Sequence, residues 1–282
     1  MNKPLIGFIG QGFVGKNYAD DFEARGCSVV RYALEEPFVK NKEKIADCDI
    51  VFIAVPTPTK NGQFDLSIVS SALTLVGKGK IAVIKSTILP GTTKDLQKQF
   101  PLFTLLFSPE FLSEVTAAYD AANPFSNIVG IPVDDEVHRV AASSVHEILP
   151  TAPFVLTCDS DEAELTKYAH NISGYTQIIT FNLIHEFATT LGHDWENIGK
   201  ALLADPLISS RYSNPVHKSG RGAGGHCFIK DFAAFANLYE ECTGDQEGVN
   251  AFRALEAKNK KLLKESGKDR ELLEEVYGKE NI

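Results

Sequence analysis

Apolar residues recur along the first half of the chain as short runs, and helical spacing follows most of these runs. Runs of this length are typical of buried strands, and they cover residues 5–9, 28–32, 50–54, 80–85, 102–107, 127–131 and 154–157. Helices are predicted between them, up to about residue 25, over 66–76, from 92 or 93 onward, and over 135–148. Strands that alternate with helices predict an α/β fold with a doubly wound parallel sheet. We therefore predict a Rossmann-type domain over residues 1–158.

The alternation ends after this domain, and residues 159–282 are predicted to be helical. Residues 161–191 carry apolar side chains at near-helical spacing, which predicts a helix that is long for a globular protein, with Gly174 as a candidate interruption. Further helices are predicted over 194–203 and 231–241, and the charged stretch 247–277 is interpreted as a solvated terminal helix. Long helices often connect domains or form dimer interfaces, so we expect an α-helical dimerisation domain and a homodimer.

A glycine-rich turn, Gly10-Gln11-Gly12-Phe13-Val14-Gly15, lies between the first strand and the first helix. In this setting Gly10 makes the tight turn and Gly12 lets a pyrophosphate approach the backbone at the helix N-terminus. Gly15 allows the helix to pack closely on the strand. The turn predicts a dinucleotide-binding site.

The end of the second strand bears on the type of dinucleotide. Proteins that bind NAD usually place Asp or Glu there to hold the ribose 2′-hydroxyl, but Ala33 occupies that position, and the nearest acids are Glu35 and Glu36. Arg31 could contact a 2′-phosphate or could be a solvated arginine at the strand edge. NAD is therefore favoured as cofactor, with NADP left open.

Polar residues follow several strands at their carboxyl ends, where ligands gather in sheets of this kind. Thr57, Thr87 and Glu110 all fall there. Each could contact a ligand or cap a loop, and the apolar neighbours of Glu110 favour the ligand contact there.

The long predicted helix carries Lys167 and Asn171 four residues apart, and therefore on one face. Polar groups on an apolar helix need partners, and a buried lysine with a lowered pKa suits base or oxyanion chemistry. The alternative is a surface lysine beside Glu164.

Residues 220–231, GRGAGGHCFIKD, combine four glycines with a cysteine. Cys227 is predicted at or near a helix N-terminus, where exposed N–H groups stabilise a thiolate, with Asp231 one turn later. Arg211 and Lys218 precede the glycines and suit an anionic ligand. The alternative is a glycine-rich turn with a buried structural cysteine.

Composition excludes several classes of function. The net charge of −9 argues against a nucleic-acid partner, and five irregularly spaced cysteines argue against a disulfide framework. The histidines show no metal-site spacing, so no metal is expected. Neither a signal peptide nor an apolar run of ~20 residues is present, so we expect a cytoplasmic protein without a membrane partner.

Several motifs occur in an order that resembles the UDP-glucose/GDP-mannose dehydrogenase family. The resemblance runs from Ile6 to about Cys242. It rests on GFIGQGFVG, VPTPT (55–59), KSTILPGTT (85–93), SPEFLSE (108–114), ELTKYAHN (164–171) and GAGGHCFIKD (222–231).

The resemblance implies oxidation of the C6 hydroxyl of a nucleotide sugar to a carboxylate, with reduction of two NAD⁺. It implies that Cys227 is the nucleophile, that Lys167 aids proton removal and stabilises the oxyanion, and that Asn171 helps to hold that oxygen. It also implies that Thr87, Glu110 and Asp231 order and activate water. The cofactor contacts that it implies are Gly10, Gly12, Phe13, Val14, Gly15, Thr57, Thr59, Thr87, Glu114 and Lys230. The substrate contacts that it implies are Phe111, Leu112, Glu114, Lys167, Asn171, Arg211, Lys218, Gly222 and Gly224.

The chain departs from the family pattern in three respects. It stops where a third, nucleotide-binding domain would begin, it lacks the ribose acid, and His226 replaces the usual serine before the cysteine. A separate nucleotide-binding subunit, a different mode of substrate binding, and a fragment or degenerate copy all stay open. We predict an NAD-dependent nucleotide-sugar 6-dehydrogenase that acts on UDP-glucose. The alternatives are a two-electron NAD(P)-dependent alcohol dehydrogenase and a non-catalytic dinucleotide-binding relative.

Overall fold

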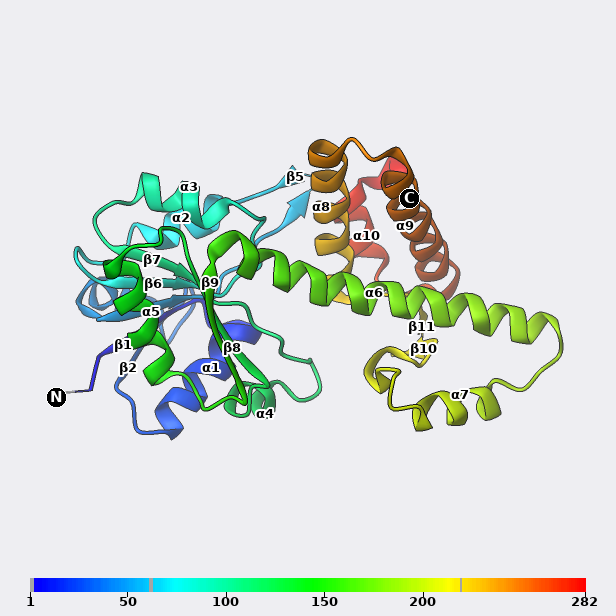
Figure 1. Ribbon diagram of the computed structural model, residues 1–282, viewed down its shortest axis with the longest axis horizontal. Coiled ribbons are helices and arrows are strands. Elements are labelled where there is room, and N and C mark those ends of the chain that lie inside the picture. The colour runs from blue at the N-terminus through cyan, green and yellow to red at the C-terminus, as the bar shows by residue number, and fades with distance from the viewer. Residues whose placement is uncertain (1–2, 61–62, 219) are drawn as a thin grey trace. The chain divides into compact units, whose positions relative to one another are not determined.

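The computed structural model describes residues 3–60, 63–218 and 220–282 (Figure 1). The chain divides into two compact units. The first unit consists of Met1–Thr57 and Asp65–Lys167, and the second consists of Pro58–Phe64 and Tyr168–Ile282. Helix α6 (Ser160–Thr190) belongs in part to each unit, because the division falls between its residues 167 and 168.

The first unit contains a seven-stranded sheet in the order β2-β1-β3-β6-β7-β8-β9. Its strands are β1 (Ile6–Ile9), β2 (Val29–Tyr32), β3 (Ile50–Ile53), β6 (Ile81–Ile84), β7 (Thr104–Phe107), β8 (Ser126–Ile131) and β9 (Phe154–Asp159). The predicted doubly wound sheet is confirmed, but it is not parallel throughout. β8 joins β7 through one antiparallel pair, Phe107 with Gly130, whereas β8 and β9 pair in parallel over six positions. β8 and β9 therefore run antiparallel to the other five strands.

Helices cover both faces of this sheet (Figure 1). They are α1 (Phe13–Ala24), α2 (Ser67–Leu73), α3 (Thr92–Gln99), α4 (Ala117–Ala122) and α5 (Glu136–Ile148), with the 3-10 helix η1 (Val39–Asp47) after β2. The buried rings of Phe8, Phe22 and Phe52 join β1, α1 and β3, with centroids 5.0 to 5.4 Å apart. Buried aromatic rings contribute large apolar areas, so this contact fixes the last turn of α1 against the sheet.

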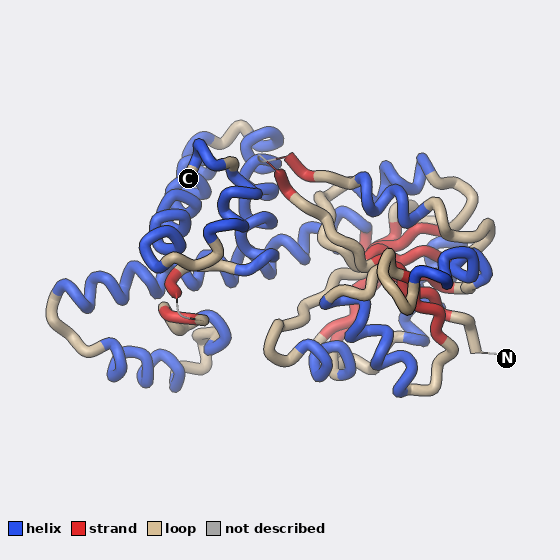
Figure 2. The backbone as a smooth tube through the Cα atoms, turned by 180° about the vertical axis from the view of Figure 1, so that it is seen from behind, coloured by secondary structure: helices blue, strands red, loops and turns tan. Residues whose placement is uncertain are grey.

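The second unit is mainly helical, as Figure 2 shows. Besides α6 it contains α7 (Trp195–Ala204), α8 (Gly225–Thr243), α9 (Gln246–Ser266), α10 (Arg270–Tyr277) and the 3-10 helices η2 (Ser210–Tyr212) and η3 (Lys279–Asn281). Two small hairpins complete it, β4 (Thr59–Lys60) with β5 (Gln63–Phe64), and β10 (Val216–His217) with β11 (Gly220–Arg221). Within the described ranges, no helix has the length and apolar composition needed to span a membrane.

Two predictions for this unit are wrong. Gly174 does not interrupt α6, because the glycine serves packing: a Cβ there would lie 2.8 Å from the ring of Tyr212. The stretch 247–277 is not one solvated helix, since it breaks at Gly267 and buries Leu263 and Leu273 in a core with α8.

Candidate active site

The glycine-rich turn closes tightly on itself and leaves the start of α1 open. Gly10 has φ of +92°, and a Cβ there would lie 2.1 Å from the carbonyl oxygen of Ala54. A Cβ at Gly15 would lie 2.0 Å from the carbonyl oxygen of Gly10. At Gly12, by contrast, a Cβ would meet no described atom within 4 Å. Two glycines therefore allow the turn to close on itself, and the third leaves the backbone at the start of α1 open, which fits a dinucleotide.

Arg31 at the end of β2 is neither a solvated strand-edge residue nor a free cation. Its guanidinium forms 2.7 Å ion pairs with Asp20 and Glu23 on α1, and its side chain is 11% exposed. It also donates to the side-chain oxygen of Gln11 at 3.4 Å. The cation beside the glycine-rich turn is thus balanced by two carboxylates.

Lys167 is buried and bound to Glu110, so its interpretation as a surface lysine beside Glu164 is wrong. The Lys167 Nζ lies 2.7 Å from both the Oε1 and the carbonyl oxygen of Glu110, and Glu110 Oε2 accepts from the N–H of Leu112 at 2.8 Å. Burial alone would raise the pKa of Glu110, but the Lys167 charge and these hydrogen bonds hold it below its usual value. The two groups form a buried ion pair (94% or more removed from solvent) on segments 57 residues apart.

Lys85 follows β6 and adds a second buried cation to this region. It is 3% exposed, donates to Ser108 Oγ at 3.2 Å, and places Nζ 4.3 Å from the ring centroid of Tyr18. Burial lowers the pKa of Lys85 to about 7, while the Glu110 carboxylate acts in the opposite direction. We assigned no role to Lys85 from the sequence, although a lysine that ends a buried apolar strand is a usable signal.

Glu164 lies one turn before Lys167 on α6 and is fully buried. Its carboxylate accepts from the N–H of Gly91 at 2.7 Å and from the N–H and hydroxyl of Thr93 at 2.8 and 2.5 Å. Burial raises the pKa of Glu164 to about 7, although the three hydrogen bonds favour the carboxylate. Glu164 therefore caps α3 from another helix and joins the segment after Thr87 to the helix that carries Lys167.

The second unit contributes Cys227, which lies in the first turn of α8 and is exposed. The predicted start of this helix at residue 231 is wrong, because α8 begins at Gly225, and the interpretation as a buried structural cysteine is wrong as well. Asp231, one turn later and 1% exposed, accepts from Asn171 Nδ2 at 2.7 Å and pairs with Lys230 Nζ at 2.5 Å. Helical spacing places Cys227 and Asp231 on one face.

The other residues nominated from the sequence divide between the units. In the first unit Thr57 is buried, Thr87, Phe111 and Leu112 are half-buried, and Glu114 is exposed. In the second unit Thr59 and Gly222 are buried, Gly224 is half-buried, and Arg211 and Lys218 are exposed. The buried Thr59 hydroxyl has no hydrogen-bond partner among the described residues.

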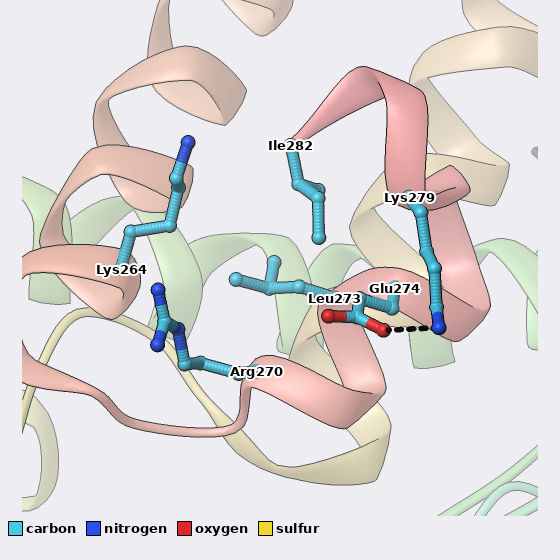
Figure 3. Close-up of a pocket in the computed structure, with 6 residues that line it drawn as sticks. All are labelled: Lys264, Arg270, Leu273, Glu274, Lys279 and Ile282. Atoms are coloured by element: carbon cyan, nitrogen blue, oxygen red, sulfur yellow. Dashed lines mark ion pairs between the residues drawn. The ribbon is translucent and has the colours of Figure 1, made fainter.

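A cavity of about 440 Å³ in the second unit contains none of these residues (Figure 3). Its walls are Lys264, Arg270, Leu273, Glu274, Lys279 and Ile282, with an ion pair of 3.5 Å between Glu274 and Lys279.

Among the described residues there is also no group of three or more His, Cys, Asp or Glu that could hold a metal ion.

Comparison with known proteins decides the family. The NAD binding domain of the UDP-glucose/GDP-mannose dehydrogenase family matches residues 37–149, and the central domain of the same family matches residues 161–260. The chain belongs to the UDP-glucose/GDP-mannose dehydrogenase family. The first match begins after the glycine-rich turn, and the second includes Lys167, Asn171, Cys227 and Asp231.

Individual members of the family are similar over most of this chain. A UDP-glucose 6-dehydrogenase of Rickettsia conorii is 30% identical in an alignment 232 residues long, which covers 78% of this chain and 52% of that protein. One from Streptococcus pneumoniae is 32% identical in an alignment 195 residues long, which covers 65% of this chain and 48% of that protein. The chain thus spans about half the length of these curated relatives.

Solved structures are similar as well. A UDP-glucose dehydrogenase of Pyrobaculum islandicum superposes with a TM-score of 0.77 at 27% identity, over 91% of this chain and 68% of that one. A 3-hydroxyisobutyrate dehydrogenase of Mycobacterium tuberculosis has the same fold, with a TM-score of 0.67 at 16% identity over 93% of this chain and 96% of that one.

Proposed function

We propose that this chain acts in the NAD-dependent oxidation of the C6 hydroxyl of a nucleotide sugar, UDP-glucose first among them, to a carboxylate. One observation carries the proposal: the exposed Cys227 in the first turn of α8, with the buried Asp231 one turn later bound to Asn171. A thiol at a helix N-terminus is suited to nucleophilic attack. Membership of the family supports this role, and so do the UDP-glucose dehydrogenases among its relatives.

The cofactor in this proposal is NAD, held on the backbone of Gly10, Gly12 and Gly15, and when bound it would accept the hydride released from C6 in each oxidation. NAD is favoured over NADP because Arg31 is already paired with Asp20, so a 2′-phosphate would have to compete with a carboxylate. The other proposed contacts are Phe13, Val14, Thr57, Thr59, Thr87, Glu114 and Lys230.

In the proposed reaction each unit supplies its own groups. In the second unit, the Cys227 sulfur forms a bond to C6 of the aldehyde, the carbonyl electrons move to oxygen, and the resulting thiohemiacetal is oxidised to a thioester. In the first unit, Lys167, which is paired with Glu110, is the group proposed to stabilise the oxyanion. Water then cleaves the thioester, which releases the carboxylate and restores the thiol; Thr87, Glu110 and Asp231 are the groups proposed to hold that water. The proposed substrate contacts also include Phe111, Leu112, Arg211, Lys218, Gly222 and Gly224.

A homodimer is part of the proposal, and exposed apolar side chains on the second unit support it. Leu183 and Phe187 on α6 are 47% and 65% exposed, Leu191 just after α6 is 53% exposed, and Leu203 on α7 is 60% exposed. Leu183 and Phe187 are four residues apart and therefore lie on one face of α6, and exposed apolar side chains on one face favour a protein contact. The molecular mass in solution tests it, and a monomer at micromolar concentration would contradict it. A separate nucleotide-binding subunit stays a prediction.

The test is an NADH assay with UDP-glucose, UDP-N-acetylglucosamine and GDP-mannose on the wild type, on Cys227→Ser and on Cys242→Ser. Cys242 lies on the same helix and is also exposed, so it is the matched control. We expect two NADH per sugar from the wild type and from Cys242→Ser, and a loss of uronate release of about 100-fold or more from Cys227→Ser. Uronate release at the wild-type rate by Cys227→Ser would contradict the thioester route. One NADH per turnover would instead support the two-electron alternative, and binding of NADH without turnover of any of the three sugars would support the non-catalytic one.

A further inference from the structure

The glycine loop before the nucleophile (residues 220–225) is held by a buried asparagine from a distant helix. Asn259 on α9 is 2% exposed. Its Nδ2 donates to the carbonyl oxygen of Ala223 at 2.9 Å, and its Oδ1 accepts from the N–H of Ala223 at 2.7 Å. One side chain thus satisfies both backbone groups of one loop residue, which a neighbouring strand would otherwise do.

The turn between α9 and α10 holds the same loop at two further points. Asp269 accepts from the N–H of Gly225 at 2.7 Å, and Lys268 donates to the carbonyl oxygen of Gly222 at 3.0 Å. The approach is close enough to explain the glycines. A Cβ at Gly222 would lie 2.8 Å from Asn259 Oδ1, and one at Gly224 would lie 2.0 Å from Asp269 Oδ2.

Glycine-rich backbone has many accessible conformations, so the loop needs such external hydrogen bonds to adopt a single one. Ala223 lies four residues before Cys227, and α8 begins between them at Gly225. The direction of the first turn of α8, and with it the position of the thiol, therefore depends on where the loop is held.

We propose that Asn259 is a positioning residue for Cys227, which through its paired hydrogen bonds to Ala223 fixes the glycine loop and the first turn of α8 for nucleophilic attack. The inference rests on the proposed function in so far as it assigns the attack to Cys227. It extends that function to a residue of the charged C-terminal region, which does not itself contact the reacting atoms.

The experiment compares Asn259→Leu and Asn259→Asp with Asn127→Leu. All three variants also carry Cys242→Ser, so that the alkylation of an exposed cysteine reports on Cys227. Asn127 is the matched control, since it is 8% exposed and its Nδ2 donates to the carbonyl oxygen of Pro150 in the first unit. Three quantities are measured well below each unfolding temperature: amide exchange of residues 221–226, the rate of Cys227 alkylation by iodoacetamide read by mass spectrometry, and kcat with the Kd for NADH.

For Asn259→Leu we expect loop exchange about tenfold faster, alkylation about threefold slower and kcat about tenfold lower, with an unchanged Kd for NADH. Asn259→Asp keeps the acceptor and regains a donor when protonated, so its kcat relative to the wild type should recover as the pH falls. Asn127→Leu should leave the loop exchange, the alkylation rate and kcat unchanged.

The proposal is overturned if folded Asn259→Leu exchanges its loop amides and alkylates Cys227 at wild-type rates. If Asn259→Leu does not fold, Asn259→Asp decides by the same measurements, and a pH-independent kcat ratio in that variant counts against the proposal. If the wild type oxidises no nucleotide sugar, the proposed function fails, whereas loop exchange and alkylation still test the role of Asn259.

Discussion

Replacement of Lys85 by methionine is expected to stabilise the first unit, by an amount that depends on pH. Lys85 and Lys167 bring two positive charges to a buried region where Glu110 supplies one negative charge. Methionine has a similar length and an unbranched, uncharged side chain, so Lys85→Met removes the surplus charge with little change in packing. Replacement of a buried charge by an apolar group of similar volume is often stabilising.

The magnitude follows from the pKa of Lys85, which burial lowers to about 7 from the usual 10.5 of a lysine. Below pH 7 the native and unfolded chains both carry the proton, so the cost of the buried charge is fully present. Between pH 7 and 10.5 the unfolded chain binds the proton and the native chain does not, so stability increases with pH. This linkage gives a cost of roughly 5 kcal/mol at pH 6 and roughly 2 kcal/mol at pH 9. The advantage of Lys85→Met should therefore shrink by about 3 kcal/mol between these two pH values.

Urea unfolding followed by circular dichroism at pH 6 and pH 9 measures this difference. Lys98→Met on α3 is the control, because the Lys98 side chain is 76% exposed, and its effect should be small and equal at both pH values. A Lys85→Met protein that is less stable than the wild type at pH 6 would refute the reasoning, and so would an advantage that grows toward pH 9.

Two further predictions follow from the first unit. In Glu164→Gln the side-chain amide N–H must face a backbone N–H at the start of α3, and two donors cannot bond each other. The free energy of unfolding, measured in urea, should therefore fall by about 1–3 kcal/mol. An unchanged free energy of unfolding would show that the cap contributes nothing to stability. The double variant Asp20→Asn with Glu23→Gln frees Arg31 from its two carboxylates, so a fluorescence titration should show about tenfold tighter binding of NADPH with little change for NADH. Equal NADPH affinity in both proteins would mean that Arg31 does not reach the 2′-phosphate.

Much of the fold could be predicted because each strand of the sheet corresponds to a short apolar run in the sequence. All seven strands of this sheet fall within a residue or two of their predicted positions, since a short apolar run with a turn at each end is enough to indicate a strand, even at β9, which is largely exposed. The hairpins β4–β5 and β10–β11 have two-residue strands, which are too short for any periodic signal.

The error in the C-terminal region has a different cause. Charged residues dominate α9, and the sequence therefore favours a solvated helix, yet Asn259 and Leu263 are buried. The burial of Asn259 depends on Ala223, which is 36 residues away, and no local pattern carries that information. The same limit applies to Lys167, whose nomination rests on helical spacing and family resemblance, while its partner Glu110 could not be deduced from either.

The start of α6 shows how these long-range contacts are combined in one short stretch of sequence. Glu164 and Lys167 are three residues apart, so they lie on the same side of the helix, and both are buried. Glu164 binds the start of α3, which follows β6, and Lys167 binds Glu110, which follows β7. One turn of helix thereby joins the segments that leave two neighbouring strands at their carboxyl ends. Because each helical residue is rotated by about 100° from the last, a spacing of three residues keeps both side chains on one side of α6, whereas a spacing of two would turn one of the two charges away from its partner.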